Sequence, residues 1–346
     1  MKVVILYDAG ADHWSDADVT AVHESLQRIA VIMRAAGHQV RKVPVRQGLG
    51  WVKACQAADL VYNLCEGLEG VSGLEPMVVG ALELTGTPFT GCGTRTTALC
   101  HRKPVINAWL AAQGLPVPEW VMPAGHRVPN DFPLPAIVKP AAEDASVGID
   151  QGAVVTSRKA LRLRVAALTE QFDEVIVQRF VAGREFNVGL VGDQVLPISE
   201  IDFSGMDKDR WHIVSFEGKW VPGSPDDLGS QPVCPAPISD ALAIQLSEIA
   251  KAAWRAVGGT GYGRVDLRVD ADGNPWVIEV NPNPDLSEDA GLARMARVAG
   301  WNYEELVLRI ADQALEVAAR TASATALAAG ATTRAERASR RRAGQS

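Results

Sequence analysis

The chain has 346 residues, of which 47% are hydrophobic and 22% charged, and its formal net charge is −7. This length exceeds the usual size of a single hydrophobic core and predicts two or three domains. The acidic balance leaves no basic surface for a polyanion, so we expect no nucleic-acid partner.

The five cysteines are odd in number and include no Cys-x-x-Cys pair, which argues against a disulfide framework and against a zinc site. The N-terminal residues 1–14 contain an apolar run of only five residues followed by an acidic stretch, unlike a signal peptide. No run approaches the ~18 apolar residues of a membrane span. We therefore expect a cytoplasmic protein with no membrane partner.

The first hundred residues alternate between strand and helix patterns. Strands are expected at residues 3–7, 39–45 and 60–64, and a helix at residues 19–36 is ended by Gly37. This order predicts a parallel sheet covered by helices, with a ligand crevice at the carboxyl ends of the strands. The following segment, residues 65–76, carries Glu66 and Glu69 among glycines before a helix, and is either a binding loop or a plain turn.

Helices are expected over residues 94–113, interrupted near Pro104, and a proline-rich connection follows. A second unit has strands at 136–139, 175–180 and 185–191 and a helix at 158–169. A third contains a helix at 239–257, a hairpin and a last helix at 303–320. We predict domains at 1–102, 103–192 and 193–320, and the Ala-, Thr- and Arg-rich composition of 321–346 predicts a disordered tail.

The hairpin, within residues 261–287, has two chemically different faces. A register centred on Asp272-Gly273 sets Asp266 opposite Glu279. Side-chain alternation then places a mostly polar set on one face: Arg264, Asp266, Arg268, Val277, Glu279 and Asn281. It places an apolar set on the other: Val265, Leu267, Val269, Trp276, Ile278 and Val280.

Two opposed carboxylates repel each other by ~0.2–1 kcal/mol unless a positive group lies between them. Either Arg264 and Arg268 neutralise Asp266 and Glu279, or a cation does. The oxygens of the two carboxylates and of Asn281 suit a hard ion such as Mg²⁺. The hairpin alone leaves both a salt-bridge ladder and a metal site open.

Two earlier segments have the chemistry of a nucleotide site. In residues 137–150, Lys139 ends an apolar strand and a loop of small residues with Ser146 follows, which suits phosphate oxygens. In residues 175–190, Glu185 near a turn is able to bind a ribose, and the backbone of 179–181 is able to read an adenine edge. A surface lysine and an ordinary hairpin explain the same residues.

Taken together, the motifs resemble the ATP-grasp superfamily, and within it D-alanine–D-alanine ligase and its relatives, from the N-terminus to about residue 320. The shared segments are TGTPFTGCG at 85–93, HRKPVINAWL with Lys103, IVKPAAEDASVGI, the VQRFVAGREF hinge, FEGKW with Lys219, GRVDLRVD and EVNPNP.

The resemblance implies an α/β N-terminal domain followed by two α+β subdomains that clasp ATP between them. It also implies that ATP phosphorylates a substrate carboxylate and that the amine of a second substrate displaces the phosphate. The implied partners are small amino acids or peptides, and a homodimer is the assembly that the family suggests.

The resemblance assigns residue roles. The implied ATP-binding residues are Lys103, Lys139, Ser146, Gln178, Phe180, Val181, Glu185 and Lys219. Lys219, at the γ-phosphate, and Arg264, at the developing charge, are the implied catalytic residues. Asp266, Glu279 and Asn281 would hold two Mg²⁺ ions, or Mn²⁺ in their place. Residues 203–232 resemble a lid that excludes water.

The amino-acid site departs from the family pattern. Those ligases carry a glutamate soon after the first strand, two adjacent serines in the VKP loop and a tyrosine beside the lid lysine. Here residues 7–10 lack the glutamate, Ala145 replaces the first serine and Trp220 replaces the tyrosine.

Asp285 and Ser287 stand where those ligases hold the second alanine's carboxylate. Asp285 would repel a carboxylate there and favour an amine, although both residues are also good N-caps for a helix at 288–299. The predicted substrate residues are therefore Glu66, Trp220, Asp285 and Ser287.

We therefore predict a carboxylate–amine ligase with an altered amino-acid site. A strict D-alanine–D-alanine ligase of peptidoglycan synthesis is the alternative. An inactive nucleotide-binding regulatory protein is a third reading, and the complete set of phosphate and metal residues argues against it.

Overall fold

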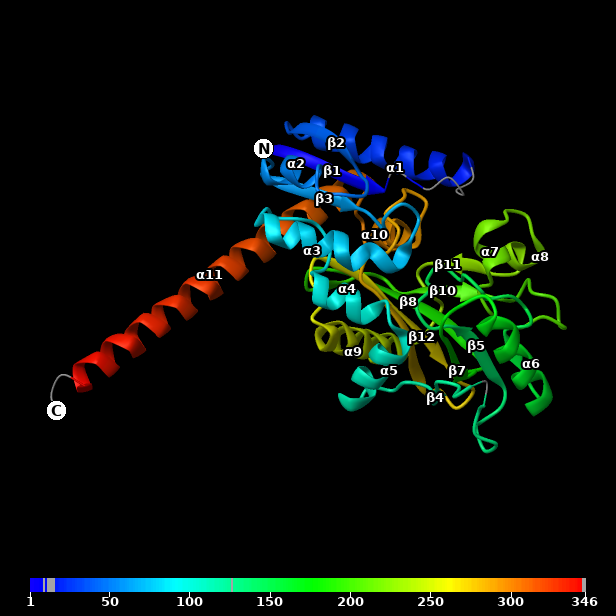
Figure 1. Cartoon of the computed structure of the whole chain (residues 1–346). Helices are drawn as coiled ribbons and strands as arrows, with labels where there is room; N and C mark the ends of the chain where they lie inside the picture. The colour runs from blue at the N-terminus through cyan, green and yellow to red at the C-terminus, as the bar shows by residue number, and fades with distance from the viewer. Residues whose placement is uncertain (9, 11–15, 126, 344–346) are drawn as a thin grey trace.

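The computed structural model describes residues 1–8, 10, 16–125 and 127–343 (Figure 1). Its first sheet is parallel, with the order β2-β1-β3: β1 (Lys2–Asp8), β2 (Gln39–Val45) and β3 (Leu60–Leu64). Helices α1 (Asp16–Ala35) and α2 (Val52–Gln56) connect the strands. The apolar runs of β1 and β3 are buried between helices on both faces, so the predicted parallel α/β arrangement is confirmed.

A second sheet is antiparallel and has the order β4-β7-β5-β6: β4 (Trp120–Val121), β5 (Ala136–Pro140), β6 (Val154–Val155) and β7 (Val175–Arg179). Helix α6 (Arg158–Thr169) packs on it through Leu161, Val165 and Leu168. The Ser157 side chain caps this helix by accepting a hydrogen bond from the Ala160 N–H at 3.2 Å.

The third sheet carries the hairpin. Its main path is β11-β10-β8-β12-β13, and β9 pairs with β8: β8 (Arg184–Val191), β9 (Gln194–Val195), β10 (Ser199–Asp202), β11 (Gln231–Val233), β12 (Tyr262–Val269) and β13 (Pro275–Asn281). Helix α9 (Asp240–Val257) covers one face through Leu246, Ala250 and Trp254, which recur once per turn. The opposite face is left to the polar residues of β8, β12 and β13.

The remaining helices are η1 (Ser72–Leu74), α3 (Glu75–Thr85), α4 (Thr94–Cys100), α5 (Lys103–Ala112), α7 (Phe216–Trp220), α8 (Pro225–Leu228), α10 (Gly291–Val298) and α11 (Tyr303–Ala343). The helical segment predicted at 94–113 is interrupted at residues 101–102, because Pro104 lies in the first turn of α5, where a missing N–H costs nothing. No helix in the described part of the chain is long and apolar enough to cross a membrane.

The segment between β7 and β8 is a crossing between sheets. β7 belongs to the second sheet and β8 to the third, so the ordinary-hairpin reading of residues 175–190 is wrong. Residues 180–183 make the crossing. Gly183 has φ +149°, and a Cβ at this position would lie 2.0 Å from the Val269 carbonyl oxygen of β12. Only glycine fits this position.

The β12–β13 register agrees with the prediction at its functional end and departs from it beyond a bulge. Asp266 lies opposite Glu279 and Arg264 opposite Asn281. The register then shifts by one residue, which moves Val277 into the core and takes Trp276 and Ile278 out of it, opposite to the predicted faces. Instead, the Arg179 guanidinium lies over the Trp276 ring, with its central carbon 4.3 Å from the ring centroid.

The C-terminal part bears on two further predictions. Helix α11 continues to Ala343 and projects away from the sheets (Figure 1), and alanine and arginine are strong helix formers. The disordered tail expected from residue 321 stays a prediction. Helix α10 begins at Gly291, so neither Asp285 nor Ser287 is its N-cap.

The first turns of α11 belong to the core of the first sheet. Leu306, Val307 and Ile310 pack in one cluster with Ile5 of β1 and Ile29 of α1. The C-terminal helix therefore closes the chain back onto its N-terminal domain. The domain boundaries at 102, 192 and 320 stay a prediction.

We expect Gly263→Ala in β12 to destabilise the fold by ~1–3 kcal/mol, because overpacking a core forces its neighbours to move. A Cβ at this position would lie 2.1 Å from the Trp254 ring. Urea unfolding measures the effect, with Gly73→Ala as the control, since a Cβ at Gly73 meets nothing within 4 Å. Equal stability of the two variants would contradict the packing argument.

Candidate active site

The polar face of β12 and β13 is organised around Asp266. Arg264 donates hydrogen bonds from Nε and Nη2 to the two Asp266 carboxylate oxygens, at 2.7 and 2.8 Å. Asn187 of β8, the cross-strand neighbour, donates from Nδ2 at 2.7 Å. The salt-bridge alternative is therefore realised for Asp266 by Arg264, and Arg268 takes no part in it.

Glu279 faces lysines from the second sheet and α5. Its carboxylate lies 3.7 Å from the Lys103 amine. Burial raises the pKa of Glu279, but the charges of Lys103, Lys139, Arg264 and Lys219 outweigh burial and hold the pKa below its usual value. Glu279 is therefore ionised at neutral pH.

The donor set at this end of the hairpin fits a hard divalent cation. It comprises the carboxylates of Asp266 and Glu279 and the amide oxygen of Asn281, which accepts a hydrogen bond from the Asn283 N–H at 3.0 Å. No group of three His, Cys, Asp or Glu side chains suited to a metal occurs in the described ranges, because the third oxygen here is an amide.

Two buried lysines enter the same cleft. Lys103 donates to the Glu143 carbonyl and to Asp144 Oδ1 at 3.1 Å. Burial lowers the pKa of Lys103, but the charges of Asp144 and Glu279 outweigh burial, so the pKa lies above its ordinary value. Lys139 has no hydrogen-bond or ion-pair partner within the described part of the chain. Burial and the charge of Lys103 lower the pKa of Lys139 to about 8. Its amine thus makes no direct ion pair in the described part of the chain, although the charges of Glu279, Glu185 and Asp144 act on it.

The loop after Lys139 is held by the predicted lid, residues 203–232. Ala145 and Ser146 have φ of 54° and 62°, which is rare for residues with side chains. Ser146 Oγ donates to the Val214 carbonyl at 2.8 Å, and Trp220 Nε1 donates to the Ala145 carbonyl at 3.0 Å. The predicted loop and lid therefore contact each other directly.

The lid has a buried anchor in Asp226, which is 1% exposed. Its carboxylate accepts hydrogen bonds from Ser215, from Arg210 and, at 3.0 Å, from Gln151 of the loop. Although burial raises the pKa of Asp226, these donors lower it to below the ordinary value. The lid is thus fixed to the loop by an ionised carboxylate.

The predicted adenine residues line the crossing from β7. Gln178 is 2% exposed, and its Nε2 has no partner among the described residues. Phe180 packs edge-on against Trp211 of the lid, with ring centroids 5.4 Å apart. A buried amide donor without a partner next to aromatic rings is suited to the edge of a base.

Arg268 connects the crossing, the lid and β12. It pairs with its cross-strand neighbour Glu185 at 3.2 Å, donates to the Val181 carbonyl at 3.1 Å and donates to the His212 carbonyl. The guanidinium carbon also lies 4.9 Å from the Phe180 ring centroid. Arg268 therefore orders the residues predicted to hold adenine and ribose.

The predicted substrate residues lie at the other end of the cleft. Although Glu66 is exposed, desolvation by the surrounding chain, together with the charges of Asp285 and Glu75, raises its pKa to about 7, against the opposing effect of Lys219. Asp285 Oδ1 accepts hydrogen bonds from the Ser287 N–H and hydroxyl, at 2.8 and 2.7 Å. Glu66 and Asp285 thus interact across one acidic space.

The segment that lacks the family's glutamate has another role here. Asp8, at the end of β1, accepts hydrogen bonds from the Glu69 and Gly70 N–H groups, both at 3.1 Å. It therefore holds the loop that follows β3. Ala9, in the same segment, lies outside the described residues.

Sequence reasoning missed several supporting residues, above all Asn187, Asp144 and Asp226. Asn187 had a readable signal, because it alternates with Glu185 on β8 and so shares its face. Asp144 lies in an irregular segment and Asp226 in the four-residue helix α8, and both segments are too short or irregular for spacing to indicate the direction of a side chain.

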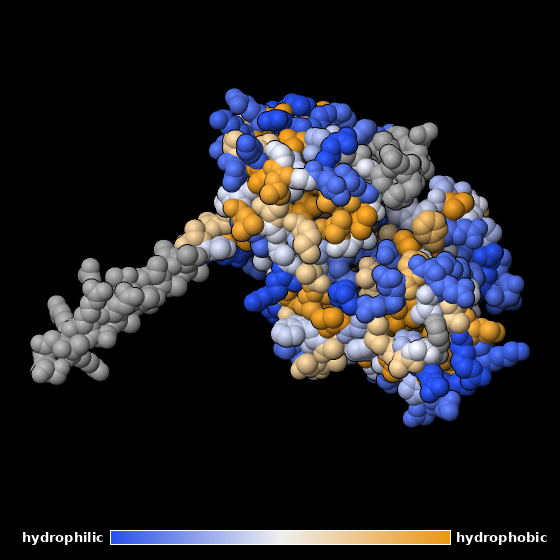
Figure 2. All heavy atoms as spheres, viewed as in Figure 1, coloured by the Kyte–Doolittle hydropathy of each residue, from blue (hydrophilic) through white to orange (hydrophobic). Residues whose placement is uncertain are grey.

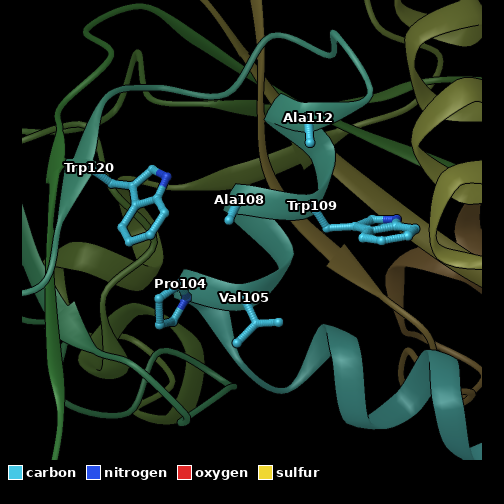
Figure 3. Close-up of a pocket in the computed structure, with 6 residues that line it drawn as sticks. All are labelled: Pro104, Val105, Ala108, Trp109, Ala112 and Trp120. Atoms are coloured by element: carbon cyan, nitrogen blue, oxygen red, sulfur yellow. The ribbon is translucent and has the colours of Figure 1, made fainter.

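An apolar groove of about 530 Å³ lies apart from this cleft, on the outside of α5 (Figure 3). It is lined by Pro104, Val105, Ala108, Trp109, Ala112 and Trp120. None of the predicted site residues lines it. Hydrophobic surface also appears over α3 (Figure 2), where Met77 and Leu84 are exposed.

Two antiparallel sheets that face each other across lysines and paired acidic residues, behind a parallel α/β domain, define an ATP-grasp ligase. The family model for the D-ala D-ala ligase C-terminus matches residues 110–312. The chain therefore belongs to the D-alanine–D-alanine ligase family, and it is an ATP-dependent carboxylate–amine ligase that forms C–N bonds.

Individual relatives agree over most of the chain. A D-alanine–D-alanine ligase of Synechococcus sp. is 31% identical over 83% of this chain and 87% of its own length. One of Chromohalobacter salexigens is 34% identical over 77% and 80%. The crystal structure of Bacillus anthracis D-alanine–D-alanine ligase complexed with ATP is 19% identical, covers 93% of this chain and 100% of its own, and has a TM-score of 0.74. The predicted combination of α/β and α+β parts is thereby confirmed.

We expect Arg268→Met to cost ~3–5 kcal/mol in the free energy of unfolding, because it leaves a buried carboxylate, Glu185, without its counterion. The control is Arg28→Met, which removes an ion pair to Glu288 with both side chains about half exposed and should cost at most ~1 kcal/mol. Urea unfolding compares them. Similar losses in both variants would show that Arg268 is not an energetic anchor.

We expect affinity for ATP to fall as pH rises through about 8, because the Lys139 amine is protonated below that pH and neutral above it. The loss should approach about tenfold per pH unit. Calorimetric titration with a non-hydrolysable analogue measures it, and Lys139→Arg, which stays charged, should remove the decline. A flat wild-type profile from pH 7 to 9.5 would contradict the assignment.

Proposed function

We propose that this ligase joins the carboxylate of one amino acid to the amine of another amino acid or small peptide, and that its amino-acid site differs from that of a strict D-alanine–D-alanine ligase. The observation that carries the site assignment is the convergence of two elements. The Asp266–Glu279 end of the hairpin and the two buried lysines of α5 and β5 meet with complementary charge.

ATP would lie between the second and third sheets. Gln178, Phe180 and Val181 would surround the adenine, and Glu185, held by Arg268, would accept hydrogen bonds from the ribose. Lys139, whose amine makes no direct ion pair among the described residues, would bind phosphate oxygens. Lys103 would exchange its contacts with Asp144 and Glu279 for a phosphate contact, and Ser146 lies in the loop beside them.

Magnesium held by Asp266, Glu279 and Asn281, as two ions, would offset the charge of the phosphates when bound. Arg264 is fixed by its two bonds to Asp266, so its guanidinium faces the same space in a defined direction. A preorganised cation of this kind stabilises charge that develops during reaction.

The chemistry proceeds in two balanced steps. A carboxylate oxygen of the first substrate attacks the γ-phosphorus, and ADP leaves. The amine nitrogen of the second substrate then attacks the acyl carbon, phosphate leaves and the nitrogen loses a proton. Lys219, whose amine lies 5.3 Å from the centroid of the Trp220 ring, would meet the γ-phosphate from the lid. The lid over the loop would exclude water from the acyl phosphate.

The acidic end of the cleft supports an altered substrate. Trp220 donates to the backbone of Ala145, so these two residues contact each other without the serine and tyrosine hydroxyls that the family pattern provides. Glu66 and Asp285 would attract an amine and repel a carboxylate at the second-substrate position. Ser287, bonded to Asp285 and 3.0 Å from Ser25 of α1, fixes this wall.

A strict D-alanine–D-alanine ligase is the second candidate. Two curated relatives that cover 83% and 77% of this chain carry that name, and this supports the dipeptide as product. The homodimer remains a prediction.

The deciding experiment is magnesium-dependent phosphate release from ATP with D- and L-amino acids, singly and in pairs, with mass spectrometry of the products. We expect release with a pair other than two D-alanines, and none from Glu279→Gln, which removes a charged metal ligand. Release with D-alanine alone and a D-alanyl-D-alanine mass would refute the altered site and support the second candidate. Normal release from Glu279→Gln would refute the metal assignment.

A further inference from the structure

A closed circuit of polar contacts joins two neighbouring positions at the end of β13. It leaves β13 at Asn281, whose side-chain oxygen accepts from the Asn283 N–H at 3.0 Å. Asn283 Nδ2 donates to Glu75 Oε1 of α3 at 2.9 Å, and the Tyr262 hydroxyl holds the Asn283 amide oxygen at 2.6 Å. The first part of the circuit thus reaches the N-terminal domain.

The circuit returns through a histidine. His101 Nε2 lies 2.6 Å from Glu75 Oε2, and His101 Nδ1 lies 3.4 Å from Asp144 Oδ2. Asp144 Oδ1 then accepts from the Lys103 amine at 3.1 Å, and that amine lies 3.7 Å from Glu279. Glu279 is two residues from Asn281, so the circuit closes at the predicted metal-binding end of β13.

The surroundings of His101 favour the protonated form of its ring. The ring is 6% exposed, and each of its nitrogens faces a carboxylate oxygen. A neutral imidazole has one N–H and one lone pair, so it would direct the lone pair at one of the two carboxylates. An imidazolium donates from Nε2 to Glu75 and forms an ion pair from Nδ1 to Asp144, although Nδ1 makes no hydrogen bond within the described residues. It also supplies the counterion that the buried Glu75 carboxylate requires.

The charges around His101 act in the same direction. Burial lowers its pKa, but the hydrogen bond to Glu75 and the charges of Asp144 and Glu75 outweigh burial and the opposing charge of Lys103. The pKa of His101 is therefore above its ordinary value. The charged groups that face the ring are Glu75 of α3, Asp144 of the loop after β5 and Lys103 of α5.

We propose that His101, as an imidazolium, is a positioning residue that clamps Glu75 to Asp144 and so aligns the phosphate-binding loop with the metal-binding end of β13. Asp144 directly precedes Ala145 and Ser146, the two non-glycine residues of that loop with left-handed backbone. Fixing Asp144 therefore fixes the start of the strained segment. The inference rests on the proposed function, since it takes that loop and that strand end as the ATP site.

The test compares His101→Gln with wild type in two measurements. The first is calorimetric binding of a non-hydrolysable ATP analogue with Mg²⁺ from pH 6 to 9. We expect His101→Gln to weaken binding about tenfold at pH 6.5, or ~1.4 kcal/mol. The ratio of the dissociation constant of His101→Gln to that of the wild type should approach one as pH rises, because the wild-type imidazolium then loses its proton. The second is an NMR titration of the histidine rings, in which His101 is assigned by its loss from the variant spectrum.

Further variants separate a clamp from a fold defect. Asp144→Asn changes a side chain that is 37% exposed, on the loop side of the clamp, and should cause a similar loss. The double variant should lose less than the sum of the two single losses, because both substitutions remove the His101–Asp144 contact. His38→Gln makes the same substitution away from the circuit and should bind as wild type does.

Three results would overturn the proposed His101 clamp, and a fourth would refute the proposed function as well. Binding by His101→Gln that equals wild type across the pH range, or a His101 ring that stays neutral at pH 6, overturns the clamp. Additive losses in the double variant overturn it as well. A wild-type protein that binds no nucleotide analogue at any pH refutes the proposed function and the clamp with it.

Discussion

The positions of the site residues depend on the pairing of opposite charges along β12. This strand lies between β8 and β13, so each polar side chain on its open face meets a cross-strand neighbour on both sides. Asp266 is held by Arg264 and Asn187, and Arg268 is held by Glu185. A buried charge without such a partner costs several kcal/mol, roughly the stability of a small domain. The pairs therefore position the site residues and make their burial tolerable.

Ion pairs and hydrogen bonds of charged side chains also join parts of the chain that are distant in sequence. Arg268 ties β12 to the crossing after β7 and to the lid, while Asp226 ties the lid to the loop after β5. His101 ties that loop to α3 of the N-terminal domain. Hydrogen bonds weaken steeply when their angles depart from the ideal, so contacts of this kind fix orientation. The cleft thus has a defined geometry although it is formed by separate sheets.

Local pattern was sufficient wherever neighbours in sequence decide the structure. The turn at Asp272-Gly273 fixed the hairpin, and with it the pairing of Asp266 with Glu279. The pattern failed at the bulge, because one extra residue inverts the facing of Trp276, Val277 and Ile278 without any mark in composition.

Periodicity and spacing along the chain were enough to predict the alternation of strands and helices, the polar face of the hairpin and the ordered motifs that resemble a ligase family. These depend on periodicity and spacing, which act over a few residues. Only the tertiary structure decided that β7 and β8 belong to different sheets and that Arg268 serves Glu185. It alone brought Glu75, His101 and Asp144 together, because their two contacts link residues 26 and 43 positions apart. Such meetings are set by how the packed sheets and helices orient their ends, and no local pattern records that orientation.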